Sequence, residues 1–372
     1  MTFVFWFSLL TLFYAFIGYP LIVRLAAALW GRKTLRGENH SPTVSVLLSV
    51  YNEEQVIRQK IENFLQLDYP EDRIELLVIS DGCSDQTEEI VRSFASDRVR
   101  LLIQEERGGK TLALNRGALE AKGEIFVFTD ANSMFRPDSV RKLMAPFLDP
   151  AVGLVSGRSV YVDAEGNETL GGIYRRYEEW IKEGESRLVS IVGADGAIYA
   201  LRRDVFEPLK PEFINDLLHP IQVVSKGLKA VSEPWAVVGE ATEDDGEAEL
   251  KRQTRIMAQS WHVCLHHLGN LIRERRYGFV WEVFSHKILR WLSLPILTGL
   301  GLSALFGLFD FFPTLSICGL LIIVLFTWIG SKGGDGIARV VWMFVVLHWA
   351  AVLGFFKFAK GEKFVTWSPR QN

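Results

Sequence analysis

Hydrophobic residues are concentrated towards the two ends of the 372-residue chain. One apolar run covers residues 2–29, and three more cover 288–312, 315–329 and 337–358. A helix needs about 20 mainly apolar residues to cross a bilayer, and these runs are of that order. Residues 31–276 instead mix apolar and polar positions as a globular domain does. The pattern predicts a membrane protein with a soluble middle.

The soluble middle alternates short apolar runs with helical patterns. Strands are predicted over 44–50, 74–80, 99–104 and 124–130, and helices over 53–67, 85–96 and 110–121. Strands that are apolar on both faces are typical of a parallel sheet covered by helices. The predicted fold class is therefore α/β, with a Rossmann-like, mostly parallel sheet. In such a sheet a nucleotide is to be sought beyond the carboxyl ends of the strands.

The second half of the middle carries further helical patterns. A long charged helix is predicted over 168–188, and the glycine-containing segment 192–206 either lines an acceptor site or forms an ordinary turn. The cationic segment 251–256 leads into an amphipathic, aromatic stretch that resembles an interfacial helix. We therefore divide the chain into an N-terminal anchor (1–30), a soluble domain (31–260), interfacial helices (261–290), C-terminal membrane helices (291–358) and a basic tail (359–372).

Charges beside the apolar runs predict the orientation. The N-terminal run lacks a basic leader and a small-residue cleavage site, which favours a retained anchor over a secretory signal. The basic residues that follow this run, Arg24, Arg32, Lys33 and Arg36, favour a cytoplasmic soluble domain. Spans over about 3–23, 291–310, 314–331 and 337–357 then place the C-terminus outside, although the basic tail favours the cytoplasm. Either one C-terminal run is interfacial, or the tail breaks the rule.

Composition excludes some classes of protein. The net charge of −3 provides no electrostatic footprint for a nucleic acid. Cys83, Cys264 and Cys318 stand far apart and form no C-x-x-C pair, which fits a reducing compartment. His262 and His266 lie one helical turn apart, but no second pair has zinc-like spacing, so an interfacial helix is favoured over a zinc site.

Polar residues gather where three of the predicted strands end. Tyr51-Asn52-Glu53-Glu54 follows the first strand, Asp81 ends the second, and Asp130 ends the fourth. Asn52, like Ser84 or Asp85, has the alternative of capping the helix that follows it. Capping does not explain why Asp81 and Asp130 both end strands. These carboxylates are therefore the first candidates for a functional site.

Four segments carry a resemblance to a known family. They are Y-N-E-E (51–54), S-D-G-C-S-D (80–85), R-G-G-K-T-L-A-L-N-R-G (107–117) and T-D-A-N (129–132). In this order and spacing the chain resembles a family 2 glycosyltransferase of the GT-A fold, in the membrane-integrated branch that includes cellulose, chitin, hyaluronan and poly-N-acetylglucosamine synthases. The resemblance covers nearly the whole chain.

The resemblance implies a reaction and its setting. The expected reaction is an inverting, metal-dependent transfer of a sugar from a nucleotide-sugar donor, most often a UDP-sugar, to a glycan or a lipid-linked acceptor. It would serve cell-surface polysaccharide or glycolipid synthesis. The protein would be a multi-pass inner-membrane enzyme with a cytoplasmic catalytic domain, with membrane lipids and polysaccharide export proteins as partners and no nucleic acid.

The resemblance also implies residue roles. Asn215-Asp216 resembles the T-E-D motif of the family, with Asp216 as the base that activates the acceptor; capping the helix that begins near Leu217 is its alternative. Asp130 and Asn132 would hold Mg²⁺ or Mn²⁺, which prefer oxygen ligands. Lys110 either reaches the donor or is a solvated lysine at a helix start. The residues expected to bind the nucleotide-sugar are Tyr51, Asn52, Glu53, Asp81, Lys110, Asp130, Arg252 and Arg255.

Two departures from the family pattern limit this inference. The second aspartate of D-x-D is Asn132, which affects metal affinity or metal choice. The window that matches Q-x-x-R-W in the processive synthases is 252–256, where Arg255 keeps a guanidinium for the diphosphate and Ile256 replaces the tryptophan. Processive polymerisation is therefore not expected. A polyprenyl-phosphate glycosyltransferase and an inactive nucleotide-sugar-binding partner in an export complex remain as alternatives.

Overall fold

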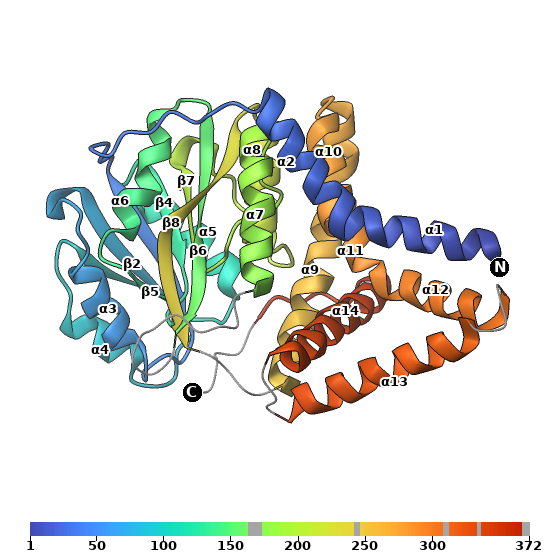
Figure 1. Cartoon of the computed structure of the whole chain (residues 1–372). Helices are drawn as coiled ribbons and strands as arrows, with labels where there is room; N and C mark the ends of the chain where they lie inside the picture. Colours follow the sequence, from blue (N-terminus) through green and yellow to red (C-terminus); the bar gives the residue numbers. More distant parts are fainter. Residues whose placement is uncertain (163–172, 242–245, 308–311, 333–335, 367–372) are drawn as a thin grey trace.

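The structure is a computed structural model that describes residues 1–162, 173–241, 246–307, 312–332 and 336–366. It consists of a globular α/β part and a group of long helices that extends to one side of it (Figure 1). The first five residues of the predicted helix 168–188 and the end of the basic tail, including Arg370, lie outside the described residues.

A mixed sheet of eight strands among the described residues forms the centre of the globular part, in the order β3-β2-β1-β4-β7-β6-β8-β5. Strands β3, β2, β1 and β4 pair in parallel, and β7 runs antiparallel to both β4 and β6. The strands are β1 (Val44–Val50), β2 (Ile74–Asp81), β3 (Val99–Gln104), β4 (Ile125–Thr129), β5 (Met134–Phe135), β6 (Val152–Val162), β7 (Ile198–Arg202) and β8 (Lys229–Ala241). The predicted α/β class and its four strands are confirmed.

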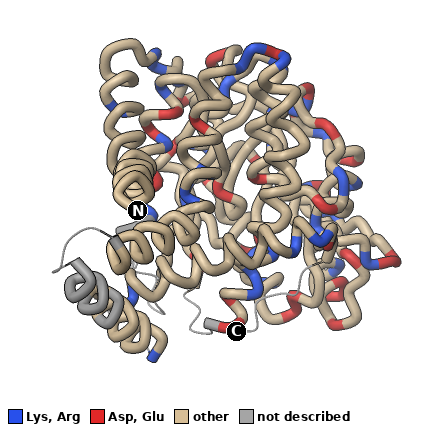
Figure 2. Tube along the Cα trace, turned by 90° about the vertical axis from the view of Figure 1, so that its right-hand side faces the viewer, with Lys and Arg blue, Asp and Glu red and all other residues tan. Residues whose placement is uncertain are grey.

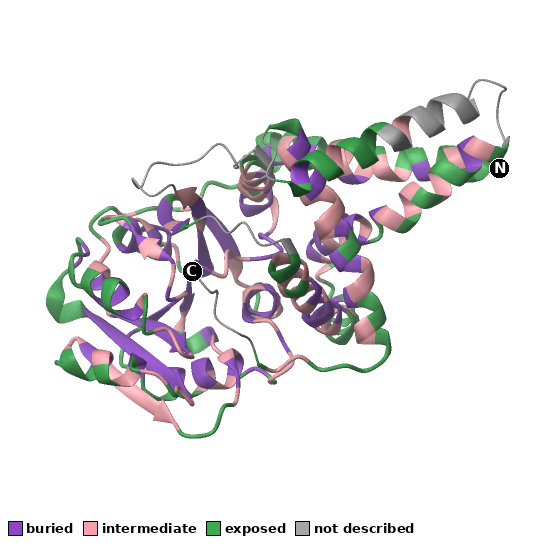
Figure 3. Cartoon of the chain, turned by 90° about the horizontal axis from the view of Figure 1, so that it is seen from below, coloured by how far each residue is buried: buried purple, intermediate pink, exposed green. Residues whose placement is uncertain are grey.

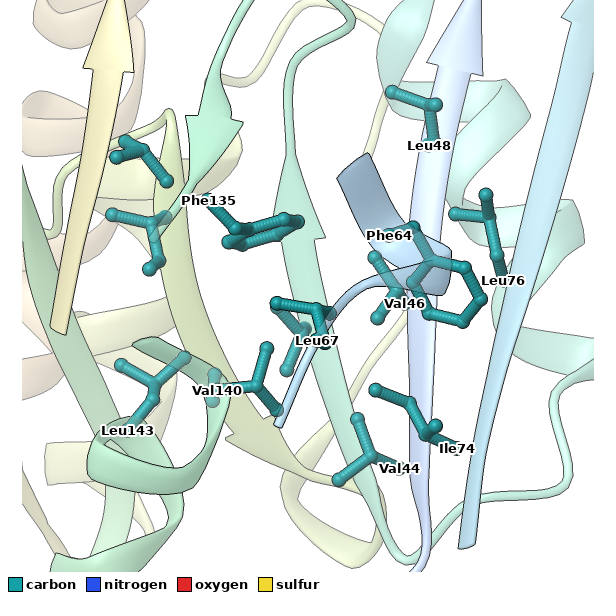
Figure 4. Close-up of a cluster of buried hydrophobic side chains, with 14 of the residues drawn as sticks. Val44, Val46, Leu48, Phe64, Leu67, Ile74, Leu76, Phe135, Val140 and Leu143 are labelled. Atoms are coloured by element: carbon teal, nitrogen blue, oxygen red, sulfur yellow. The ribbon is translucent and has the colours of Figure 1, made fainter. Parts of the chain in front are cut away.

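Helices cover both faces of this sheet. Because successive residues of a strand point to opposite faces, Val46 of β1 packs with Phe64 in one core and Leu47 packs in the other. Figure 4 shows the first core, in which Phe64 lies over β1 and β2. This core includes α3 (Ile57–Leu65), α4 (Thr87–Ser93) and α6 (Ser139–Met144), and the second includes α5 (Lys110–Glu120) and α8 (Asn215–Ser225). The carboxyl ends of β1, β2 and β4 are thereby fixed side by side.

The remaining helices attach a mainly apolar arm to the globular part. At the N-terminus α1 (Thr2–Phe13) packs on α12, and α2 (Tyr19–Trp30) packs on α7 (Ile173–Leu188). Figure 3 shows the arm projecting from the globular part, and Figure 2 shows that its tube is mostly free of acidic and basic residues. The other helices are α9 (Gly246–Arg273), α10 (Tyr277–Val283), α11 (Leu289–Trp291), α12 (Ser293–Gly307), α13 (Phe312–Ser331) and α14 (Ile337–Ala359).

Among the residues that the structure describes, two continuous helices and one bent pair of helices are candidates for membrane spans. By length and composition, the continuous helix Thr2–Trp30 and the helix Ile337–Ala359 suffice to cross a membrane. A third candidate is the pair Tyr277–Trp291 and Ser293–Phe306, which is bent by 58°. Residues 291–310 therefore do not form one straight span, because the chain turns sharply at Leu292. The first and last predicted runs are helices of spanning length.

Part of the predicted interfacial stretch lies inside the protein. It begins within α9, whose Trp261 is 4% exposed and packs against Trp291 and Phe355. Cys264 is fully buried in the same core. These two side chains therefore help to hold α14 against the globular part. The amphipathic pattern of the sequence does not distinguish such a buried face from one that contacts lipid.

Candidate active site

The end of β1 is a tight turn that is bonded to the end of β2. Asn52 has a left-handed backbone, with φ of 53°. Its backbone N–H donates to Cys83 Sγ at 3.3 Å, and its side-chain oxygen accepts from the Ser84 N–H at 2.8 Å. Asn52 therefore joins two strand ends and does not cap α3. Asp85 accepts a hydrogen bond from the Thr87 N–H at 3.0 Å, but the residue at the N-cap of α4 is Gln86, so Asp85 does not occupy the cap position itself.

Asp81 holds the glycine loop that precedes α5. Its side chain is fully buried, and its carboxylate accepts from the Gly108 N–H at 2.7 Å, the Gly109 N–H at 2.9 Å and Gln104 Nε2 at 2.9 Å. These bonds satisfy the carboxylate and fix where α5 begins. The structure thus gives Asp81 a positioning role, and its contact with a nucleotide stays a prediction.

Lys110, the first residue of α5, crosses to the end of β4. Its ammonium forms an ion pair with Asp130 Oδ1, and the two side chains are 28% and 39% exposed. Lys110 is thus a member of the site and not only a solvated lysine at a helix start. At the end of β1 the Arg107 guanidinium lies 3.6 Å from the centre of the Tyr51 ring. Lys110 therefore contacts the carboxylate that was predicted to hold the diphosphate, and the Tyr51 ring is covered by a second cation at the end of β1.

A buried lysine is hydrogen-bonded to the loop that contains Asp130. Lys60 donates to Thr129 Oγ1 at 3.0 Å and to the carbonyl of Ser133, so it joins both ends of the loop. Burial lowers the pKa of Lys60 to about 7, although the charge of Asp130 acts in the opposite direction. Asn132 is partly exposed and makes no hydrogen bond with the residues that the structure describes.

Asp216 lies in the first turn of α8, which begins at Asn215. The position before the helix is Ile214, so the alternative in which Asp216 caps this helix is wrong. Its backbone carbonyl accepts from the Ala194 N–H at 2.8 Å. A Cβ built at Gly196 would lie 2.9 Å from Asp216 Oδ2, so a larger residue at position 196 would displace this carboxylate.

The electrostatic surroundings of Asp216 suit a base. The pKa of this carboxyl is raised to about 6, mainly by burial and also by Asp195 and Asp130, although Lys110 and Lys287 act in the opposite direction. A general base works best when its pKa is near the operating pH. The residue as a whole is partly exposed to solvent. With this pKa the carboxylate is mostly ionised in neutral solution.

Hydrogen bonds attach the segment before Asp216 to α5. Thr111 Oγ1 donates to the carbonyl of Phe213 at 3.0 Å, and Asn115 exchanges bonds of 2.8 and 3.0 Å with Leu209. Lys110 and Asp216, which are about 100 residues apart in sequence, are thereby held in one frame. The reacting groups of a two-substrate enzyme need fixed relative positions, because small displacements of such groups lower the reaction rate strongly.

The two arginines of the 252–256 window differ in their surroundings. Arg255 is partly buried on α9, which lowers its pKa, and the charges of Asp130 and Asp216 act on it. It therefore lies within electrostatic range of both carboxylates, and its contact with the diphosphate stays a prediction. Arg252 instead forms a two-pronged pair with Glu249, at 2.8 and 2.9 Å. Its contact with a donor stays a prediction that would require this pair to open.

Two charged residues near Asp216 were missed from the sequence. Asp195 accepts from the backbone N–H and the hydroxyl of Ser159, both at 2.7 Å. Its position between two glycines, Gly193 and Gly196, was the available signal. Lys287 lies about 70 residues after Asp216, in a segment whose pattern indicated only an interfacial helix. Neither residue is marked as part of a site by its local pattern.

The oxygen ligands that remain accessible fit a hard divalent cation. Asp130 offers a carboxylate and Asn132 an amide oxygen that no described residue occupies. The described residues contain no group of three or more His, Cys, Asp or Glu side chains arranged to hold a metal ion. Mg²⁺ and Mn²⁺ commonly complete their coordination with water and substrate phosphates, so a site with two protein ligands is adequate when a diphosphate is bound.

The glycine loop supports one prediction. Gly109 has φ of +90°, and a Cβ built on it would lie 2.1 Å from the carbonyl oxygen of Val365. Gly109→Ala should displace both the loop that Asp81 holds and Lys110, and lower donor affinity about tenfold. Titration with nucleotide would measure this. Gly227→Ala is the matched control, since Gly227 has φ of +82° but only the tip of Arg276 nearby. An equal loss of affinity in the control would contradict a local effect.

Comparison with known proteins supports the assignment of the fold and the family. Residues 45–209 match the model of the family described as Glycosyl transferase family 2. The chain is 28% identical over 258 residues to the probable glycosyltransferase YdaM of Bacillus subtilis, which covers 65% of this chain and 61% of YdaM. It is 32% identical over 130 residues to the β-monoglucosyldiacylglycerol synthase of Trichormus variabilis, over 34% of this chain and 28% of that protein. The chain thus spans less than two thirds of these relatives.

A solved structure matches nearly the whole chain. It is the mannosyltransferase PcManGT from Pyrobaculum calidifontis, in complex with GDP-Man and Mn²⁺. The match covers 97% of this chain and 100% of that one, with a TM-score of 0.74 and 21% identity. At this identity the likeness shows the fold alone, which is the GT-A fold.

The sheet and the match to this solved structure define the fold of the chain as the GT-A fold. Residues 45–209 are similar to the family 2 glycosyltransferases, the family that the four sequence motifs resemble.

Proposed function

We propose that the protein transfers a sugar from a nucleotide-sugar, with inversion, to a hydroxyl of a membrane-borne or glycan acceptor. The observation that carries this proposal is the arrangement of Asp216, with its pKa of about 6, beside the pair of Lys110 and Asp130. A base and a phosphate-binding group are the two elements that a one-step displacement needs.

The proposed steps assign a role to each group. The Asp216 carboxylate accepts the proton of the acceptor hydroxyl, whose oxygen attacks the anomeric carbon of the donor sugar. The bond from that carbon to the diphosphate oxygen breaks, and the nucleoside diphosphate leaves with the electron pair. Arg255 and Lys110 offset the charge that develops on this leaving group. A divalent cation on Asp130 and Asn132 would neutralise the diphosphate further when it is bound.

The donor is proposed to be a UDP-sugar and the cation Mg²⁺ or Mn²⁺. The Mn²⁺ and GDP-Man in the mannosyltransferase of the same fold support metal use and make guanosine the base to test beside uridine. The name of the Trichormus relative, a β-monoglucosyldiacylglycerol synthase, supports a lipid acceptor. Tyr51 and Glu53, at the end of β1, are proposed to contact the nucleotide.

The setting is proposed to be a membrane, with the catalytic domain on the cytoplasmic side. Its supports are the two apolar helices of spanning length and the basic residues that follow the first of them. Polysaccharide or glycolipid synthesis in an inner membrane, with export proteins as partners, belongs to the same proposal. A reporter fused after the soluble domain would test the orientation.

A donor screen tests the proposed function directly. The detergent-purified protein is supplied with Mn²⁺ or Mg²⁺ and a panel of UDP- and GDP-sugars, and donor hydrolysis and transfer are measured. We expect turnover of at least one donor, and loss of turnover with a chelator. Normal binding of a nucleoside diphosphate without any turnover would instead identify an inactive nucleotide-sugar-binding partner. A sugar-phosphate lipid product would identify a polyprenyl-phosphate glycosyltransferase.

A further inference from the structure

Lys287 reaches the candidate active site from the helices of the membrane arm. It lies in a π-helical turn, Phe284–Ile288, between α10 and α11. A Cβ built at Gly193 would lie 3.6 Å from Lys287 Cε, 3.7 Å from its Nζ and 4.0 Å from Leu217 Cδ1. Leu217 follows Asp216, and Lys287 is close enough to act on the charge of Asp216. π-Helical turns occur often at functional sites because they redirect a side chain.

Two basic residues close to Lys287 in sequence, His286 and Arg290, have protein partners. His286 contacts Glu185 through Nδ1 at 2.6 Å and Glu178 through Nε2 at 2.9 Å. Arg290 pairs with Glu178 and donates to the Tyr177 hydroxyl at 3.0 Å. Both side chains are almost fully buried. They hold α7 against the arm and leave no charge of their own for a ligand.

Lys287 differs from these neighbours. It is partly exposed, and within the parts of the chain that the structure describes it forms no hydrogen bond or ion pair. The carboxylate of Glu185 is already engaged by His286 and by the Tyr19 hydroxyl, at 2.5 Å. Although its charge also acts on Glu178 and Glu185, an ammonium that forms no ion pair with the described residues and lies near a proposed base is suited to an anionic group on a substrate.

The position of Lys287 indicates where that substrate comes from. Its segment continues through α11 into α12, and this bent pair of helices is one of the candidate spans. The sugar donor is proposed to lie at the ends of β1 and β4, whereas Lys287 approaches Asp216 from the arm. The segment 192–206, which was predicted either to line an acceptor site or to form a turn, passes close to Lys287 at Gly193 and to Asp216 at Gly196. A membrane lipid is therefore the substrate that we expect to approach Asp216 from the side of Lys287.

We infer that Lys287 binds the phosphate of a membrane lipid whose hydroxyl accepts the sugar. This inference rests on the proposed function and specifies its acceptor as a phosphate-bearing lipid, in preference to a neutral one. The reaction is unchanged: the hydroxyl loses its proton to Asp216, its oxygen bonds to the anomeric carbon, and the nucleoside diphosphate leaves. Lys287 contacts only the acceptor phosphate.

Paired acceptors and variants test this inference. The protein in phosphatidylcholine vesicles is given donor sugar with phosphatidylglycerol, polyprenyl-diphosphate N-acetylglucosamine or diacylglycerol, and transfer is measured. Lys287→Gln should raise the KM for the best phosphate-bearing lipid about tenfold, with nucleotide binding unchanged, and Lys287→Arg should retain most affinity. Lys332→Gln, an exposed lysine at the far end of α13, should behave as wild type.

Several outcomes would overturn the inference. Equal slowing of Lys287→Gln on all acceptors, with the acid limb of its pH profile moved upward, would mean that Lys287 only tunes Asp216. Preference for diacylglycerol, or donor hydrolysis without transfer to any of the lipids, would remove the phosphate-bearing acceptor. Equal use of soluble glycerol phosphate would remove the lipid. Absence of all donor turnover would contradict the proposed function instead.

Discussion

Asp216→Asn is expected to abolish sugar transfer while the protein still binds its donor. Asparagine keeps the size of the side chain but cannot accept a proton, and loss of a general base typically lowers kcat by about 10²–10⁴-fold. The Ala194 hydrogen bond uses the backbone carbonyl of residue 216, so the substitution does not remove it. Single-turnover transfer and nucleotide titration, measured on the same preparation, separate the chemical step from binding.

The same substitution should stabilise the fold above pH 6. The folded pKa of Asp216, about 6, exceeds the ordinary 3.8, so its stabilising contribution is complete below about pH 4 and is lost as the pH rises through 6. Asn carries no charge at any of these pH values. We expect a gain of about 1–2 kcal/mol at pH 7.5, a moderate figure because the residue is partly exposed to solvent. Denaturant unfolding at pH 4 and 7.5 measures it.

The control and the pH profile make this prediction specific. Asp97→Asn alters an exposed carboxylate after α4 and should change neither transfer nor stability. The wild-type transfer rate should fall as the pH drops below about 6, because Asp216 then becomes protonated. Full activity of Asp216→Asn, or a wild-type rate that is level down to pH 4.5, would mean that another group is the base.

The sequence predicted the nucleotide-binding half of the sheet accurately for a physical reason. Strands such as 44–50 and 74–80 are covered by helices on both faces, so their residues are apolar without interruption. The four predicted strands match β1 to β4 closely. The Asp81 and Asp130 carboxylates follow from these strands, because a residue that ends a parallel strand has a fixed place in the fold.

The other half of the sheet was not predicted, because its strands lack that pattern. β8 contains Pro234 and several charged or polar residues, and β6 contains glycines and serines. β7 lies within the glycine-containing segment that was interpreted as an acceptor wall or a turn. These strands are defined by pairings between distant parts of the chain, such as β4 with β7, which no local pattern reveals.

The same limit applies to the candidate site. The resemblance located Asp216, but its pKa is raised by burial and is opposed by Lys287, which arrives from another helix. Asn52 is a residue type that often caps helices, yet its left-handed backbone places its side chain against Ser84, in the turn that follows β2. Asn and Asp side chains suit caps and turns equally, so tertiary contacts decide between them.

Because Asn132 replaces the second aspartate of D-x-D, Asp130 is the one carboxylate of this motif that could hold a metal ion. Asp130→Ala should weaken donor binding about 10–100-fold in the presence of Mn²⁺ and much less when the metal is removed, because the lost carboxylate would act through the cation. It also removes the partner of Lys110. Calorimetric titration with nucleoside diphosphate, with Mn²⁺ and with a chelator, gives both values.

The opposite change should strengthen the same interaction. Asn132→Asp restores a second anionic oxygen beside Asp130 and should tighten Mn²⁺-dependent binding about tenfold, since each added carboxylate stabilises a divalent cation. The buried Lys60 that braces this loop lies close enough to offset the added charge. If Asn132→Asp leaves the metal dependence unchanged while Asp130→Ala abolishes it, Asn132 lies outside the coordination sphere, and Asp130 alone connects the protein to the metal.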